Sequence, residues 1–253
     1  MKTSRILLLI VSVSFALLML SACAGTQKTQ QGKQSRGFFG WFKKAIATPE
    51  DDPVSLSKEA MGYFSKGRYM LAEEIFQKIR DRYPFSPYAT LAELRLADCK
   101  FYQGLYEEAI PLYQEFEKLH PTNEAVSYVI FQEGSCYYRL MASADRDQTY
   151  THQMIETYRR LLRRYPDNPY SYEAQKRIEE GRNRLAQHEV VVAKWYLRTN
   201  QLPQAKMRLE TAVELYPETP AAKEARKILA GKLKDVSLEQ AANQIPWWER
   251  MLP

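Results

Sequence analysis

An 18-residue pattern recurs four times along this chain, and each copy ends in proline. The copies span 67–84, 104–121, 149–166 and 200–217. In each, a large apolar residue is followed three positions later by another apolar residue, which is large in the first three copies and alanine in the fourth. In three of the four, a small residue lies four positions before this pair. This is the spacing of one face of an α-helix. Such a repeat is typical of stacked helical hairpins, because one hairpin alone cannot bury its apolar face.

Counting back from each closing proline, as position 32 of a 34-residue unit, puts the copies in one register. Positions 8, 20, 24 and 27 then hold the sets Ala60, Ala97, Gly134, Ala193; Ala72, Ala109, Met154, Ala205; Phe76, Tyr113, Tyr158, Leu209; and Ile79, Phe116, Leu161, Ala212. Small residues let two helices approach closely, and proline ends the second helix because it has no backbone donor. This tetratricopeptide signature predicts an all-α fold, a tetratricopeptide-repeat superhelix of about four to five helical hairpins.

The spacings between closing prolines are longer than 34 residues, which predicts departures from a regular array. We expect an insertion at about 141–148, between the helices of the third copy. A run over about 170–198 without proline predicts a connecting helix that merges into the first helix of the fourth copy. A final helix is expected at about 221–232.

The N-terminus carries the features of an export signal. Lys2 and Arg5 precede a 15-residue apolar run, shorter than a membrane-spanning helix needs. The run ends in Leu20-Ser21-Ala22-Cys23, which matches a bacterial lipobox, although an ordinary secretory signal beside a cysteine is the alternative. We expect cleavage after residue 22 and lipidation of Cys23, with the acyl chains holding the protein on a membrane surface. Ala24, in place of an aspartate, favours the outer membrane.

These features divide the chain into a signal peptide (1–22), a lipid-anchored tether (23–52), a tetratricopeptide-repeat domain (53–234) and a C-terminal tail (235–253). The tether carries an aromatic and basic segment around Phe38–Phe42, which fits a membrane interface. A disordered tether and docking of these aromatics into the protein's own groove are alternatives. Trp247-Trp248 in the tail is interpreted as a partner-docking peptide or a lid on the last helix.

No catalytic, metal or cofactor pattern is found. The three histidines, His120, His152 and His188, lie outside any metal-binding spacing, and no phosphate loop or nucleophile elbow is present, so an enzyme is not expected. Cys99 and Cys136 fall on neighbouring first helices, whose axes lie about 8–10 Å apart. Since a disulfide needs Cα atoms within about 7 Å, we expect two free, buried thiols.

A basic run, Arg159-Arg160-Leu161-Leu162-Arg163-Arg164, forms two ridges on its helix, 159/163 and 160/164. The net charge of +6 is mild, and nucleic acid is a poor partner for an exported lipoprotein. We interpret the ridges as solvated, with contact to an acidic partner or to phospholipid as the second possibility.

A partner could dock on the concave face that positions 2, 5, 9, 12 and 13 of each unit line. Exposed aromatic groups gathered on one surface usually indicate binding. The hypothesis is a groove for an extended, aromatic-containing segment, formed by Phe64, Phe101, Tyr102, Phe131 and Tyr138. The alternative is that some of these side chains pack against the next hairpin.

One segment is more specific than the repeat. Residues 82–88 read RYPFSPY, which resembles the BamD (ComL-like) lipoproteins of the outer-membrane β-barrel assembly machinery. The resemblance continues through 120–122, 128–129, 176–177 and 184–186, and covers about 53–232. It implies a periplasm-facing scaffold that binds the periplasmic domains of the barrel protein BamA and other machinery subunits, and that receives unfolded outer-membrane proteins through its N-terminal repeats. It also implies that Arg177 and Arg184, with the last helix, face BamA.

The alternative function is a tetratricopeptide-repeat lipoprotein that coordinates cell-wall or secretion machinery, such as a peptidoglycan-associated factor or a secretin pilot. An enzyme regulator or an unrecognised hydrolase ranks third. The RYPFSPY segment favours barrel assembly, because generic repeats share only its Tyr-Pro pair.

Overall fold

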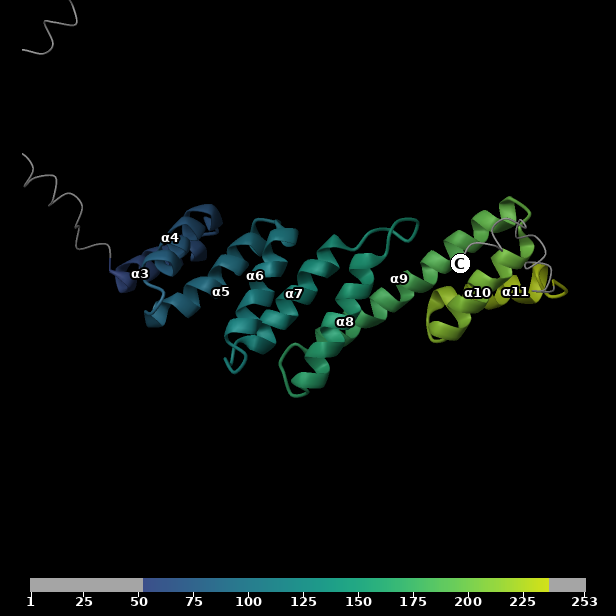
Figure 1. Ribbon diagram of the computed structural model, residues 1–253. Helices are drawn as coiled ribbons and strands as arrows, with labels where there is room; N and C mark the ends of the chain where they lie inside the picture. The colour runs from purple at the N-terminus through teal and green to yellow at the C-terminus, as the bar shows by residue number, and fades with distance from the viewer. Residues whose placement is uncertain (1–51, 237–253) are drawn as a thin grey trace, which may run out of the picture. The chain divides into compact units, whose positions relative to one another are not determined.

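The computed structural model describes residues 52–236, and all regular structure in that range is α-helical (Figure 1). The helices are α3 (Pro53–Ser65), α4 (Tyr69–Arg82), α5 (Pro87–Tyr102), α6 (Tyr106–Leu119), α7 (Val126–Leu140), α8 (Thr149–Arg164), α9 (Ser171–Arg198), α10 (Leu202–Leu215) and α11 (Pro220–Lys232). The expected signal peptide, Cys23, Phe38–Phe42 and Trp247-Trp248 lie outside the described residues.

Each helix packs against the next in sequence, which makes a series of hairpins: α3 with α4, α5 with α6, and α7 with α8 (Figure 1). First helices of neighbouring hairpins also meet, as α3 and α5 do. The all-α prediction is therefore confirmed.

The repeat register matches the core. All residues at positions 8, 20, 24 and 27 of the four copies are buried, from Ala60, Ala72, Phe76 and Ile79 in the first hairpin to Ala193, Ala205, Leu209 and Ala212 in the fourth. Small side chains bring the helices of each hairpin together, and the large ones fill the space beside them. The sequence pattern thus describes real packing.

The turns within three of the hairpins share one backbone conformation. Three-residue turns join the helices, and their middle residues Gly67, Gly104 and Asn200 have φ of 72°, 80° and 58°. Glycine and, less often, asparagine adopt this left-handed conformation at low cost. The third hairpin lacks such a turn and instead has the loop 141–148, so the predicted insertion is confirmed.

The third hairpin also departs from the pattern of small residues. Met154 occupies a position where the other copies have alanine, and Gly181 on α9 compensates: a Cβ there would lie 2.5 Å from the Met154 Cε. Similarly, a Cβ on Gly134 would lie 2.5 Å from the ring of Tyr158. Two glycines therefore make room for two large side chains in this hairpin.

The 28-residue helix α9 belongs to two layers. Ala174, Ile178 and Leu185 pack with α7 and α8, whereas Val190 and Ala193 pack with α10 and α11. The interpretation of a connecting helix that merges into the first helix of the fourth repeat is confirmed, as is the final helix.

The two cysteines of the described part are free and buried. Burial raises the pKa of the Cys99 and Cys136 thiols to about 12, because a thiolate is disfavoured in an apolar environment. They act as small apolar residues, as expected.

Candidate functional site

The first three helices and the start of α6 carry an aromatic cluster, here the N-terminal aromatic cluster: Phe64, Tyr69, Phe101, Tyr102 and Tyr106. Tyr102 stacks on Tyr69 with 5.1 Å between ring centroids, and Phe64 packs edge-on against both at 5.4 and 5.7 Å. Phe101 extends the cluster to Tyr106 at 5.4 Å. Tyr102 remains 48% exposed, so the cluster presents apolar area to solvent.

A second cluster, the central aromatic cluster, comprises Phe131, Tyr138, Tyr158, Tyr170 and Arg177. It joins α7 and α8 to the beginning of α9. Phe131 stacks on Tyr170 with 4.6 Å between centroids. The Arg177 guanidinium carbon lies 5.1 Å from the Phe131 ring centroid and 4.8 Å from that of Tyr138, which is cation–π geometry.

Hydrogen bonds hold Arg177 in this position. Its Nη1 donates to the Tyr158 hydroxyl (2.6 Å) and to Ser135 Oγ (2.8 Å), and its Nε donates to Glu173 (2.8 Å). Burial alone would lower the pKa of Arg177, but contact with Tyr158 and Glu173 leaves it raised. The guanidinium is therefore a fixed positive charge among aromatic rings.

Asp98 connects the two clusters. Its carboxylate is fully buried and accepts hydrogen bonds from the Tyr113 and Tyr128 hydroxyls (both 2.8 Å) and from Arg95 (2.6 Å). Arg95 in turn lies over the Phe64 ring, at 5.3 Å. Burial raises the pKa of Tyr113 and Tyr128, so both remain neutral donors to the carboxylate. One buried anion thus orients side chains that face both clusters.

The five predicted groove residues lie in these two clusters. Phe64, Phe101 and Tyr102 belong to the N-terminal one, and Phe131 and Tyr138 to the central one. Arg177 and Arg184 had been assigned together by resemblance, but Arg177 lies among the groove residues. Arg184 is half-buried further along α9.

The concave-face pattern also included residues that the structure places inside the core: Ser57, Leu94, Asp98 and Ser135 are all buried. Conversely, it missed Tyr69 and Tyr106, which extend the N-terminal cluster. Each follows its turn glycine by two residues, so their recurrence was a usable signal. Arg95 and Tyr170 had no such signal, because the rings they contact, Phe64 and Phe131, are distant in sequence.

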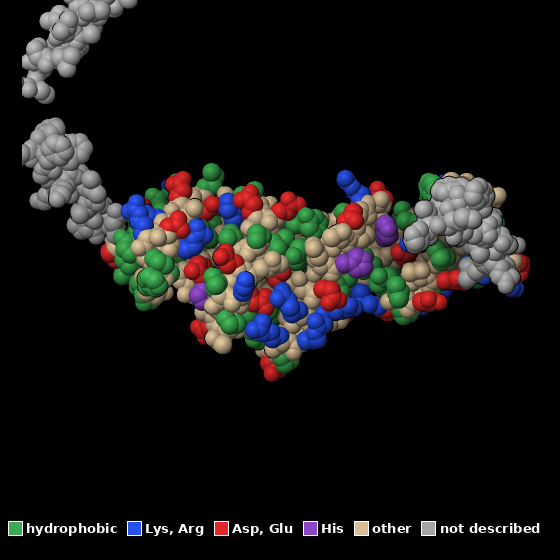
Figure 2. All heavy atoms as spheres, in the orientation of Figure 1, with side chains coloured by type: hydrophobic (Ala, Val, Ile, Leu, Met, Phe, Trp, Pro, Cys, Tyr) green, Lys and Arg blue, Asp and Glu red, His purple; other side chains and the backbone are tan. Residues whose placement is uncertain are grey.

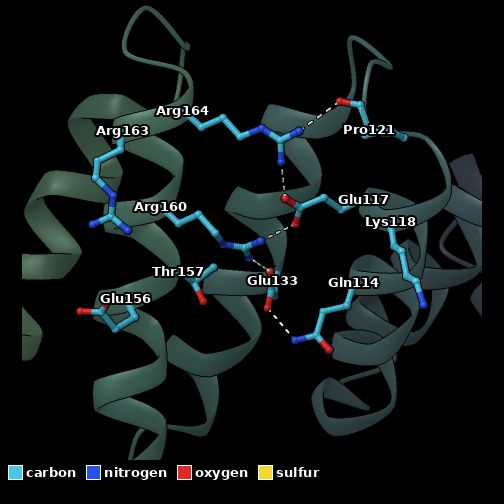
Figure 3. A pocket seen from close by; sticks show the side chains of 10 residues that line it. All are labelled: Gln114, Glu117, Lys118, Pro121, Glu133, Glu156, Thr157, Arg160, Arg163 and Arg164. Atoms are coloured by element: carbon cyan, nitrogen blue, oxygen red, sulfur yellow. Dashed lines mark hydrogen bonds and ion pairs between the residues drawn. The ribbon is translucent and has the colours of Figure 1, made fainter.

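A separate charged pocket of about 610 Å³ lies between α6 and α8 (Figure 3). Glu117 accepts from Arg160 (2.6 Å) and Arg164 (2.7 Å), and Arg160 also pairs with the buried Glu133. Burial raises the pKa of Glu133, against the lowering effect of Gln114 and Arg160. The 160/164 ridge is solvated, since the Arg160 and Arg164 side chains are 38% and 41% exposed, but carboxylates of other helices partly neutralise its charge.

The described residues contain neither a metal-binding cluster nor a membrane-spanning helix. Between residues 52 and 236, three or more metal-ligating side chains nowhere come together. Over the same range, every helix is too short or too polar to cross a membrane.

The stacked hairpins and the two aromatic clusters define a helical-repeat protein with a preformed, partly exposed aromatic surface. The chain belongs to the YfiO family of outer membrane lipoproteins, whose model matches residues 49–245. The resemblance deduced from the RYPFSPY segment is thereby confirmed.

Several relatives are named outer membrane protein assembly factor BamD. That of Vibrio cholerae is 26% identical over 213 residues, covering 80% of this chain and 88% of the relative. That of Caulobacter vibrioides is 25% identical, covering 82% and 68%, and that of Neisseria gonorrhoeae is 25% identical, covering 93% and 86%.

Similarity to solved structures is weaker. A tetratricopeptide repeat protein from Parabacteroides merdae has a TM-score of 0.39 and 14% identity, covering 72% of this chain and 75% of that one. The fold assignment therefore rests on the helices and their register.

Proposed function

We propose that this chain is a non-enzymatic scaffold lipoprotein that assists the assembly of outer-membrane barrel proteins. Family membership over residues 49–245 and relatives named as assembly factors support this role. In this proposal, Cys23 carries the lipid anchor and the repeat domain faces the periplasm.

The observation that carries the proposal is the partly exposed aromatic surface. An unfolded barrel protein offers extended segments in which apolar or aromatic side chains alternate with polar ones. The N-terminal and central aromatic clusters can pack against the aromatic side chains of such a segment through their rings and the fixed Arg177 cation. Because these groups are already held in place, binding requires little rearrangement of this chain. We assign Phe64, Phe101, Tyr102, Phe131 and Tyr138 to the contact with such segments.

The second part of the proposal is a contact with the periplasmic domains of a BamA-like barrel protein, made by the C-terminal half. Arg184 is suited to it, because it is half-buried on α9 and makes no hydrogen bond or ion pair with any other described residue. Arg177 is the less suitable of the two predicted residues, since its guanidinium donors are already used within the central cluster.

Purification of the lipidated protein from detergent-solubilised envelopes tests this function. The expected result is recovery of a large barrel protein with periplasmic repeat domains. Arg184→Glu should reduce that recovery, whereas Arg139→Glu, which changes an exposed arginine on α7, should not. Recovery of cell-wall or secretion factors alone would instead support the alternative, a coordinator of that machinery.

A further inference from the structure

The two arginine ridges of α8 have different surroundings, and the difference points to a second interaction surface. Arg160 and Arg164 point toward Glu117 in Figure 3, whereas Arg163 lies apart with no dashed line to any labelled group. Within residues 52–236, Arg163 makes no hydrogen bond or ion pair. Carboxylates of other helices pair with both arginines of the 160/164 ridge, whereas in the 159/163 ridge only Arg159 has a partner, Glu156 on its own helix.

A hollow of about 390 Å³ lies beside the 159/163 ridge, between α8 and α9. Its lining consists of Arg159, Leu162, Arg163, Gln175, Ile178 and Arg182. Residues 175, 178 and 182 follow the i, i+3, i+7 spacing of one helix face, so α9 presents one continuous side to α8. The lining thus combines three guanidinium groups, one amide and two aliphatic side chains, without a carboxylate.

Three carboxylates at the edges of the hollow interact with residues of its lining. Glu156 pairs with Arg159 at 3.2 Å on the same helix, and Glu218 pairs with Arg182 at 2.5 Å from beyond α10. Glu179 accepts a weak hydrogen bond from Gln175 at 3.3 Å. The Arg159–Glu156 pair is exposed on both sides, and such pairs contribute little to stability, so an incoming carboxylate can replace Glu156. Arg182 is held more firmly, because it also donates to the Leu215 carbonyl. Figure 2 shows Lys and Arg side chains gathering on the surface near α8.

We propose that this hollow, here the α8–α9 arginine hollow, binds an acidic segment of a partner protein in which carboxylates alternate with apolar side chains. Guanidinium groups bind carboxylates with two parallel hydrogen bonds, and Leu162 and Ile178 provide an apolar floor between them. A recessed floor and flanking carboxylates suit a peptide, which can place each charge separately, better than a flat anionic membrane.

This surface is separate from the aromatic clusters, and the proposal does not depend on their role. Arg163 is the best residue to test, since its replacement breaks no hydrogen bond or ion pair within residues 52–236. Lys58 on α3 is a matched control, because it is an exposed cation on another hairpin.

The test measures binding of a fluorescein-labelled peptide of alternating leucine and glutamate to the full chain by fluorescence anisotropy. Arg163→Gln should weaken binding about tenfold, because each charge-assisted hydrogen-bond pair contributes on that order. Arg159→Gln combined with Arg163→Gln should weaken it further. Lys58→Gln should bind like the parent, and binding should fall as salt rises.

Two results would overturn the proposal. One is equal binding of the parent and Arg163→Gln, or of the glutamate peptide and its glutamine counterpart. The other is Arg163-dependent binding to phosphatidylglycerol vesicles without Arg163-dependent binding to the peptide, which would make the hollow a lipid contact.

Discussion

Asp98 allows the sharpest test of how the fold supports the aromatic surface. Its buried carboxylate accepts from Arg95, Tyr113 and Tyr128. Asp98→Ala would leave the fully buried Tyr113 hydroxyl without a partner, which costs about 1–3 kcal/mol. Removing one member of a buried ion pair costs about 3–5 kcal/mol, but the Arg95 side chain is 27% exposed and can regain water. We therefore expect a total loss of about 3–4 kcal/mol in the free energy of unfolding.

The assay is urea unfolding followed by far-UV circular dichroism. Asp98→Asn keeps the volume and one acceptor oxygen, so it should cost less, about 1–2 kcal/mol. Adding Tyr113→Phe to Asp98→Ala should recover about 1–2 kcal/mol, because it removes the orphaned hydroxyl. Asp145→Ala, in the loop 141–148, is the control with an exposed carboxylate and should leave the midpoint unchanged. An Asp98→Ala midpoint equal to that of the parent would refute the reasoning.

Two further predictions concern the third hairpin. Gly134→Ala should lower stability by up to about 2 kcal/mol, because overpacking costs about 1–3 kcal/mol and alanine regains about 1 kcal/mol in helix propensity. Gly181→Ala should cost less, since the group that its Cβ meets first is the flexible end of a methionine. Scanning calorimetry that showed the opposite order would count against the packing account. Burial raises the pKa of Glu133 above 4.5, so the folded state keeps its proton to higher pH than the unfolded state, and the stability it contributes falls as pH rises from about 4.5 through the folded pKa. Glu133→Gln removes this titration, so the urea midpoint of the parent should decline relative to the variant as pH rises above about 4.5. Parallel profiles would contradict the assignment.

The core could be predicted from the sequence because its signal is local and repeated. Ala72, Phe76 and Ile79 lie on one face of one helix, so their spacing alone identifies them as buried. The same holds for the turn glycines, since a left-handed residue between two helices favours glycine. Features that depend on residues within one hairpin could therefore be predicted from the sequence alone.

The charged and aromatic contacts were harder to predict from the sequence because they join residues that are distant along the chain. Arg164 meets Glu117 across 47 positions, and Arg177 meets Ser135 across 42. No local pattern distinguishes Arg160, which is paired across helices, from Arg163, which is not. The sequence indicated the residue types on each face, but only the packing of α6, α7, α8 and α9 determines which of them meet.

The central claim is that the aromatic clusters bind extended, aromatic-containing segments. The most direct test is the affinity of the full chain for a peptide from the C-terminal strand of an outer-membrane barrel protein, measured by isothermal titration calorimetry. Phe101→Ala combined with Tyr138→Ala removes one ring from each cluster and should weaken binding at least tenfold, without loss of helical signal. Tyr172→Ala is the matched control, because Tyr172 is 83% exposed and lies outside both clusters. Equal affinities for the parent and the Phe101→Ala/Tyr138→Ala variant would contradict the account.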